Sequence, residues 1–167
     1  MTSQSPASRY QFRPMSADNL PLLRRWLAMP HVAEWWGDAD QQFDLVSGDL
    51  DQPAMDQFIV ATQQHPFAYL QCYEPAAWPE GGLGAHPQGT RGIDQFIGEA
   101  AMVNRGHGSA FIRAFTDDLL GAGTPRIVTD PDPRNARAIR AYEKAGFVKN
   151  DLVDTADGIA LLMVRNA

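Results

Sequence analysis

A pair of glycines between a strand pattern and a helix pattern constrains this chain more than any other feature. The segment Arg105-Gly106-His107-Gly108-Ser109-Ala110 follows a strand-like run at residues 91–98 and precedes an amphipathic pattern at 109–120. Glycine lacks a Cβ atom, so it permits positive φ and leaves neighbouring backbone N–H groups unshielded. Such groups at a helix N-terminus bind anions, and phosphates above all. The sequence therefore predicts a phosphate-bearing ligand at this turn.

Three classes of phosphate ligand fit glycines between a strand and a helix. A mononucleotide P-loop is excluded, because no Gly-Lys-Ser/Thr follows the glycines. A dinucleotide fold is disfavoured, because Phe111 stands where the third glycine belongs and too little chain surrounds the turn for a doubly wound sheet. Asp130, at the end of the next strand pattern, matches the ribose-binding acid of that fold. Coenzyme A is the third candidate.

Hydrophobic periodicity predicts one domain of mixed α/β (α+β) class over residues 9–167. We expect the polar residues 1–8 to form a flexible tail. A long loop rich in proline and glycine spans 75–90, and loops of this length in a domain are usually functional or disordered. Helices are expected at 16–28, 31–36, 43–50, 109–120 and 135–145, and strands at 58–62, 67–73, 91–98, 126–130, 152–154 and 159–164.

The segment from Asn135 to Phe147 carries a more specific pattern than the glycines. It reads Asn-Ala-x-Ala-Ile-x-x-Tyr-x-Lys-x-Gly-Phe and follows the glycine turn by one helix and one strand. This pair of segments resembles the signature of the GNAT acetyltransferases. The resemblance implies a central mixed, mostly antiparallel sheet flanked by helices, with acetyl-CoA as co-substrate and no metal. Met102 and Val103 stand where the family usually has Arg or Gln, although Arg105 is adjacent.

Within that family the chain is similar to the aminoglycoside 6′-N-acetyltransferases. The similarity is carried by Trp26-Leu27, His31 to Gly37, Arg91 to Gln95, Val128 to Pro133 and the 135–147 segment. It implies transfer of an acetyl group to the 6′-amino group of an aminoglycoside, and hence antibiotic resistance. Siderophore-pathway acyltransferases, which act on hydroxylated diamines, share the general pattern. A non-catalytic module that binds coenzyme A or a cation is the alternative outside the enzymes.

The resemblance also assigns roles at the cofactor end. It implies that backbone N–H groups of residues 106–110 bind the diphosphate, with charge added by Arg105, and that Asn135 contacts the pantetheine or caps its helix. We expect the His107 side chain to be exposed. Tyr142 is expected to protonate the leaving thiolate, unless it is a core tyrosine. The backbone N–H groups of Gln95, Phe96 and Ile97 are expected to polarise the thioester carbonyl.

At the acceptor end the resemblance points to carboxylates and aromatic rings. Asp94 interrupts an apolar strand, so it forms either a structural salt bridge or a general base that orients the amine. Asp130 is either a turn residue or a contact for the cationic substrate. Aromatic rings stack on sugars and cations. Trp35, Trp36 and Tyr73, with Glu34, are expected to shape this pocket, although either tryptophan fits a core position equally well.

Charge and composition limit the partners. A net charge of −6 argues against nucleic acid and suits a cationic small molecule. Cys72 lies in a strand pattern typical of a buried hydrophobe, and the four histidines lack metal-ligand spacing. No apolar run is long enough to span a membrane, so we expect a cytoplasmic protein. A homodimer is compatible with the sequence.

Overall fold

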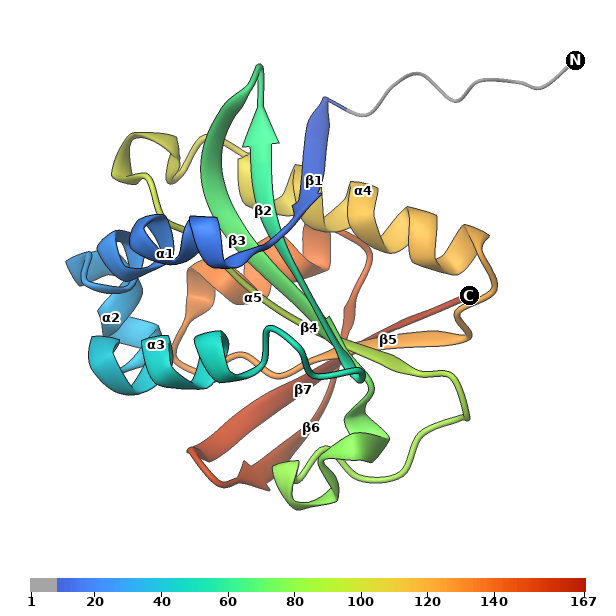
Figure 1. Cartoon of the computed structure of the whole chain (residues 1–167). Coiled ribbons are helices and arrows are strands. Elements are labelled where there is room, and N and C mark those ends of the chain that lie inside the picture. The colour runs from blue at the N-terminus through green and yellow to red at the C-terminus, as the bar shows by residue number, and fades with distance from the viewer. Residues whose placement is uncertain (1–8) are drawn as a thin grey trace, which may run out of the picture.

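A twisted sheet of seven strands organises the computed structural model, which describes residues 9–167 (Figure 1). The tail predicted at 1–8 lies outside the described residues. The strand order is β1-β2-β3-β4-β5-β7-β6, and β4–β5 is the one parallel pair in this sheet. The strands are β1 (Tyr10–Pro14), β2 (Met55–Thr62), β3 (His65–Tyr73), β4 (Arg91–Ile97), β5 (Arg126–Thr129), β6 (Val148–Thr155) and β7 (Gly158–Asn166).

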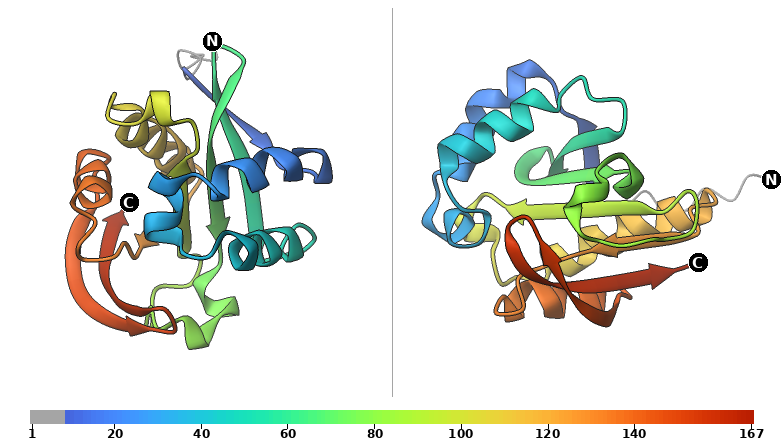
Figure 2. Two further views of the ribbon diagram at one scale, coloured as in Figure 1. Left: turned by 90° about the vertical axis from the view of Figure 1, so that its left-hand side faces the viewer. Right: turned by 90° about the horizontal axis from the view of Figure 1, so that it is seen from below.

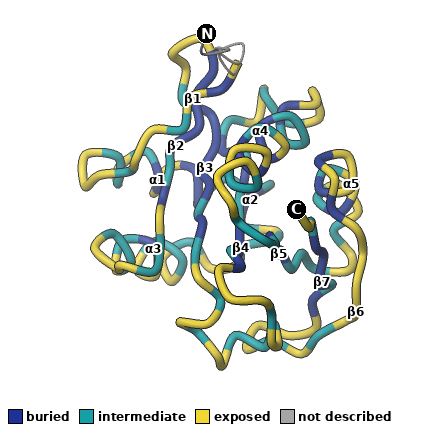
Figure 3. Tube along the Cα trace, turned by 90° about the vertical axis from the view of Figure 1, so that its right-hand side faces the viewer, coloured by how far each residue is buried: buried dark blue, intermediate teal, exposed yellow. Residues whose placement is uncertain are grey.

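Helices cover both faces of the sheet, as Figure 2 shows. On one face the helices are α4 (His107–Gly121) and α5 (Ala136–Lys144); on the other they are α1 (Leu20–Leu27), α2 (Pro30–Trp36) and α3 (Ala39–Gly48). Each face has its own hydrophobic cluster, one centred on Phe111 and Ile112 of α4 and one on Trp26 of α1. Figure 3 shows the buried strands between these layers, while most of β6 is exposed. The mixed, mostly antiparallel sheet flanked by helices is therefore confirmed.

The parallel strands β4 and β5 pair over a short distance and then separate. Their register is limited to Arg91↔Ile127 and Gly92↔Val128. One residue further on, the Thr129 hydroxyl donates a 2.9 Å hydrogen bond to the Ile93 carbonyl in place of a backbone ladder. On its other side β4 stays paired with β3 as far as Ile97↔Ala68. Residues 94–97 therefore present one edge that β5 does not cover.

The sequence patterns located most elements, with errors at their ends. The helix expected at 43–50 is α3 and starts earlier, at Ala39, because Asp38 caps it by accepting a hydrogen bond from the Gln41 amide. The strand pattern at 152–154 extends to the whole of β6. Strand β1 was missed: Tyr10 and Phe12 alternate with polar residues and pack on the α4 side of the sheet. No helix among residues 9–167 has both the length and the apolar character needed to cross a bilayer.

Gly98 allows the closest approach between the end of β4 and helix α1. A Cβ atom at this position would lie 2.2 Å from the indole ring of Trp26. That ring is 1% exposed, and its Nε1 donates a 2.9 Å hydrogen bond to Glu99. The Gly98 amide is itself fixed by a 2.8 Å hydrogen bond to the Phe67 carbonyl. Neither the ring nor the backbone is free to move away.

We expect Gly98→Ala to lower the free energy of unfolding by about 1–3 kcal/mol, because the added methyl group overpacks a rigid contact. Denaturant unfolding of the purified variant measures this loss. Gly121→Ala is the matched control, since a Cβ atom at this helical glycine meets nothing within 4 Å. It should leave stability unchanged or raise it by about 0.5–1 kcal/mol. Equal effects of both substitutions would contradict the steric argument.

Candidate functional site

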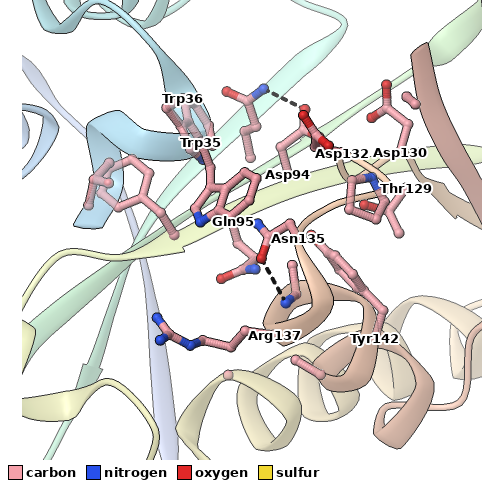
Figure 4. Close-up of a pocket in the computed structure, with 18 of the residues that line it drawn as sticks. Trp35, Trp36, Asp94, Gln95, Thr129, Asp130, Asp132, Asn135, Arg137 and Tyr142 are labelled. Carbon is pink, nitrogen blue, oxygen red and sulfur yellow. Dashed lines mark hydrogen bonds between the residues drawn. The ribbon is translucent and has the colours of Figure 1, made fainter. Parts of the chain in front are cut away.

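One elongated cavity of about 770 Å³ opens where β4 and β5 separate. It reaches the N-terminus of α4 and one side of α5 at one end. At the other end it is bounded by α2, α3, the loop after β3 and the turn between β6 and β7. Figure 4 shows labelled residues of α2, β4, β5 and α5 around one space. The cavity thus brings together segments from almost the whole length of the chain.

The glycine turn forms the end of this cavity beside α4. Asn104 and Gly106 have positive φ angles of 61° and 80°, and α4 begins directly afterwards at His107. An α-helix leaves the N–H groups of its first turn without i−4 carbonyl partners. Gly106, His107, Gly108 and Ser109 all line the cavity. The predicted juxtaposition of unshielded amides and an open space is therefore present.

Two residues of the glycine turn depart from expectation. The Ala110 amide donates to the Gly106 carbonyl at 3.3 Å, and the Ala110 side chain packs against the core. Arg105 is exposed. Neither residue lines the cavity, so the predicted direct contacts of Arg105 and Ala110 with a ligand are not supported. The first helical turn ends the row of available amides one residue earlier than the sequence suggested.

The side chain of His107 is buried, which corrects the expectation that it is exposed. It is 7% exposed, and its Nδ1 lies 2.9 Å from the Tyr10 hydroxyl. Aromatic rings of Tyr10 and Phe67 pack against it with centroids at 5.9 and 5.3 Å. Burial lowers the pKa of His107, which favours the neutral imidazole. The residue therefore ties the glycine turn to the first strand of the sheet.

The uncovered edge of β4 forms the middle of the cavity. Gln95, Phe96 and Ile97 all line it. His31 of α2 holds the end of this strand, since its Nε2 lies 2.8 Å from the Ile97 carbonyl. A carbonyl oxygen only accepts hydrogen bonds, so Nε2 must carry the proton. This contact fixes α2 against the C-terminal end of β4, beyond the point where β4 and β5 diverge.

Tyr142 and Asn135 face the middle of the cavity from α5. Tyr142 is 4% exposed, and Thr129 and Gln95 interact with its hydroxyl. Burial and the nearby Asp94 charge raise the pKa of Tyr142, so the phenol keeps its proton at neutral pH. Asn135 is the N-cap of α5, because its Oδ1 accepts from the Ala138 amide at 3.2 Å (Figure 4). It also lines the cavity, so capping leaves it beside any ligand.

Asp94 is held by side chains from the neighbouring strand. Gln71 of β3 donates from Nε2 to Asp94 Oδ2 at 2.9 Å, as drawn in Figure 4. The Tyr69 hydroxyl in turn donates to Gln71 Oε1 at 2.8 Å. Asp94 forms no ion pair with the described cations, so the salt-bridge interpretation is not supported. One carboxylate oxygen is oriented by an amide, and the other remains toward β5.

Asp130 follows β5 directly and lies beside Asp94. The two carboxyl groups interact through a hydrogen bond. Burial, followed by the charges of Asp94 and Asp157, raises the pKa of Asp130 to about 8. Burial also raises the pKa of Asp94, while hydrogen bonds from Gln71 and Asp130 oppose this rise. Burial and the closeness of the two carboxyl groups therefore favour one proton shared by the pair at neutral pH.

Aromatic residues surround the acceptor end, as predicted, but they are not equivalent. Trp36 packs its ring on Phe96 and Tyr69, with centroids at 5.0 and 6.1 Å. Trp35 does not belong to the core clusters and faces the cavity (Figure 4). Tyr73 also lines the cavity. Glu34 is exposed and lies outside the cavity lining, so its predicted contribution to the pocket is not supported.

Sequence reasoning missed several lining residues of the loop at 75–90 and of the β6–β7 turn. Trp78 packs edge-on against Tyr73 at 5.9 Å and lines the cavity, as do Leu83 and Asp157. Gly82 lies so close to β6 that a Cβ atom there would be 2.2 Å from the Asp154 carbonyl oxygen. The loop is thus packed on the β6–β7 hairpin. The length and the Pro/Gly content of the loop at 75–90 predicted a functional loop, but no local pattern predicted its contacts with the β6–β7 hairpin.

A metal centre has no basis in the described part of the chain. Among residues 9–167, no three His, Cys, Asp or Glu side chains lie close enough together to hold a metal ion. Cys72 is buried, and burial raises the pKa of its thiol. The lining of the cavity includes helix-end residues, the carboxyl pair, amide side chains and the phenol of Tyr142.

Comparison with known proteins agrees with this geometry. Residues 16–155 match the family described as acetyltransferase (GNAT) domain. The aminoglycoside N(6′)-acetyltransferase type 1 of Klebsiella pneumoniae is 35% identical over 162 residues, which are 92% of this chain and 81% of that protein. A kanamycin resistance protein of Rhizobium radiobacter is 45% identical over 78 residues, which are 46% of this chain and 72% of that protein.

Solved structures add the three-dimensional likeness. The aminoglycoside acetyltransferase AAC(6')-Ib in complex with coenzyme A and kanamycin has a TM-score of 0.85 to this fold at 33% identity, with 94% of each chain covered. The same enzyme as a second complex, with acetyl-CoA and an aminoglycoside, has a TM-score of 0.86 at 32% identity. From the match over most of its length, the diverging parallel strands and the amide-lined helix end, this chain belongs to the GNAT acetyltransferase family.

Proposed function

We propose that this protein transfers the acetyl group of acetyl-CoA to an amine, and that the amine is the 6′-amino group of an aminoglycoside. The observation that carries the proposal is a single cavity that joins helix-end amides to a buried carboxyl pair. The first suits the phosphates of coenzyme A and the second a cationic amine. The relatives named above, which act on aminoglycosides, support the same substrate class.

In the proposed reaction both substrates bind together and the acetyl group moves in one direct transfer. The neutral amine attacks the thioester carbonyl and forms the C–N bond. Backbone N–H groups on the uncovered edge of β4, at residues 95–97, stabilise the oxyanion. The C–S bond then breaks, and the Tyr142 phenol gives its proton to the thiolate. No acyl-enzyme on Cys72 is required.

The carboxyl pair resolves a conflict in binding a cationic nucleophile. Acidic groups attract an ammonium ion but also raise its pKa, which opposes formation of the neutral amine. With one proton shared by Asp94 and Asp130, the pair carries one negative charge rather than two. Asp94 then accepts the proton of the amine, directly or through water. Gln71 acts as a positioning residue, because its hydrogen bond fixes the Asp94 carboxylate.

Other acceptors and arrangements remain as alternatives to the main proposal. Siderophore-pathway acylation would place an N-hydroxylated diamine at the same carboxyl pair. A binding module would hold coenzyme A or a cation without turnover. Arrangement as a homodimer and location in the cytoplasm stay predictions, which light scattering and cell fractionation test.

The central prediction concerns activity and Asp94. We expect thiol release from acetyl-CoA with kanamycin-like acceptors, exceeding that with N-hydroxylated diamines or polyamines assayed side by side. Asp94→Asn should lower kcat by roughly 10²–10⁴-fold, because a general base is removed. Tight coenzyme A binding with no thiol release on any acceptor would favour the binding module.

The control for Asp94 is Asp44→Asn on α3. Asp44 is exposed and does not line the cavity. The kcat of the Asp44→Asn variant should equal that of the unaltered protein. An Asp94→Asn variant that kept normal kinetics over the whole pH range would remove Asp94 from the mechanism.

A second prediction separates chemistry from binding at Tyr142. Tyr142→Phe keeps the ring packed on Phe147, whose centroid lies 5.5 Å away, and removes only the proton donor. We expect kcat to fall by about 10²-fold with KM for acetyl-CoA little changed. A thioester with a more acidic thiol, which needs less protonation on leaving, should recover part of the loss. An unchanged kcat in this variant would instead make Tyr142 a packing residue.

A third prediction follows from the raised pKa of Asp130. Because the folded protein keeps a proton that the unfolded chain loses near pH 4, the stability from this proton falls as pH rises from about 4 to about 8. The expected slope is at most about 1.4 kcal/mol per pH unit. In Asp130→Asn this slope should disappear, as measured by denaturant unfolding at pH 5 and pH 8.

The matched control is Asp151→Asn, since Asp151 is exposed on β6 and lies outside the cavity. It should retain the pH dependence of the unaltered protein. If Asp130→Asn also retained it, the shared proton would not reside on this pair.

A further inference from the structure

His31 joins helix α2 to the uncovered edge of β4. It is the second residue of α2, and its Nε2 donates a hydrogen bond to the Ile97 carbonyl oxygen at 2.8 Å. Trp35 stands four residues later, a spacing that places both side chains on one side of the helix. Both residues line the cavity, and Figure 4 shows Trp35 across this space from Tyr142 of α5. One histidine therefore connects the α2 wall of the cavity to the strand edge in its middle.

The pairing of β4 with β3 shows which way the Ile97 carbonyl points. Opposite residues of an antiparallel pair alternate between those that exchange hydrogen bonds and those that do not. The Gly98 amide donates to the Phe67 carbonyl at 2.8 Å, so these two residues form a bonded pair. Ile97, opposite Ala68, is therefore in an unbonded pair, and its N–H and C=O groups point away from β3. The carbonyl that His31 occupies belongs to the edge that is open to a ligand.

The same alternation places the backbone groups of Ile93 and Gln95 on the uncovered edge. Thr129 donates to the Ile93 carbonyl at 2.9 Å, and His31 donates to that of Ile97. Gln95 lies between these two occupied carbonyls and lines the cavity. The edge thus presents a short stretch to a ligand, bounded by Thr129 of β5 and His31 of α2.

Helix α2 is too short to hold its own position. It has seven residues, and isolated helices shorter than about 12–15 residues are marginal in water. Apolar contacts keep it on the sheet, since Val32 is 2% exposed and Trp36 packs on Phe96 with ring centroids 5.0 Å apart. Such contacts are non-directional, whereas a hydrogen bond has a preferred distance and angle. Packing therefore keeps α2 on the sheet, and His31 fixes where it lies along the β4 edge.

We propose that His31 is a positioning residue for acetyl transfer, and that its hydrogen bond to Ile97 holds the Trp35 wall at a fixed distance from the β4 edge. This inference rests on the proposed function, in which the thioester lies along that edge. The diphosphate and the amine would bind at the two ends of the cavity, whereas His31 is bonded to its middle. His31 therefore governs how the reacting groups meet rather than how tightly each substrate binds. A misplacement of about 1 Å between reacting groups costs roughly 100-fold in rate.

The test uses three substitutions that differ in how far a hydrogen-bond donor reaches. Glutamine carries an N–H group at the reach of histidine Nε2, asparagine carries one nearer the backbone, and leucine carries none. We expect His31→Asn and His31→Leu to lower kcat with acetyl-CoA and a kanamycin-like acceptor by roughly 10- to 100-fold. KM for both substrates should change little. His31→Gln should retain most of the activity, because its amide still reaches the Ile97 carbonyl.

Hydrogen exchange supplies a readout that does not depend on turnover. The Ala33 amide donates to the Met29 carbonyl and the Gly37 amide to the Ala33 carbonyl, both at 2.9 Å. These amides of α2 should exchange faster in His31→Asn and His31→Leu than in His31→Gln, because the helix has lost its directional attachment. Exchange in the central strands of the sheet should stay unchanged, which shows that the variants are folded.

The matched control is His65→Asn, since His65 is exposed at the start of β3 and does not line the cavity. Its kcat, its KM values and its exchange in α2 should equal those of the unaltered protein.

Two results would overturn this inference alone, in a protein that does acetylate an amine. One is a normal kcat in His31→Leu. The other is an equal loss in His31→Gln and His31→Leu, which would show that the hydrogen bond is not responsible. The proposed function fails in a different way, because the unaltered protein would then acetylate no amine. The role of His31 in transfer would fail with it, while hydrogen exchange would still show whether His31 fixes α2.

Discussion

The separation of β4 from β5 is the constraint on which the rest of the site depends. Two pairs of residues hold the parallel strands together, and beyond Gly92 the backbone of β4 has no strand on one side. A sheet tolerates such an opening only if its polar edge finds other partners. Thr129 and His31 occupy two of the carbonyl groups. The remaining edge is available to a ligand, with α4 at one end of the opening and Asp130 at the other.

Burial governs the protonation of Asp94 and Asp130 at the acceptor end of the cavity. A pair of ionised carboxylates in a half-buried cavity would repel each other, so one proton stays with the pair. Gln71 cannot supply charge, yet it stabilises the Asp94 carboxylate as a hydrogen-bond donor. In the proposed function, the pair would attract a cationic amine with a single negative charge, and Asp94 would accept the proton of that amine. Asp157, in the turn between β6 and β7, adds negative charge near the pair.

Local sequence patterns predicted the elements whose chemistry is local. Gly106 and Gly108, the Asn135 cap and the run to Phe147 each depend on neighbours within a few residues, so the helices α4 and α5 were predicted correctly. Strand β1 was missed because five residues ending in proline carry little pattern, although Tyr10 and Phe12 alternate. His107 contacts Tyr10 across 97 residues, and Gln71 contacts Asp94 across 23 residues. No pattern in a short stretch of sequence can predict contacts over such separations. Trp78, by contrast, packs on the nearby Tyr73. For that reason the prediction that the His107 side chain is exposed was wrong.

The buried contact between Tyr10 and His107 connects two parts of the molecule that are far apart in sequence. The first strand is an edge strand, held to the sheet on one side by β2. Among the described strands none pairs with the outer edge of β1, so side-chain anchors contribute strongly to holding it. One such anchor is the contact of Tyr10 with His107, the first residue of α4. The order of β1 and the proposed affinity of the glycine turn for phosphate are therefore thermodynamically linked. In the proposed function, fraying of β1 would weaken the binding of phosphate at the glycine turn, and a phosphate bound there would in turn suppress the fraying.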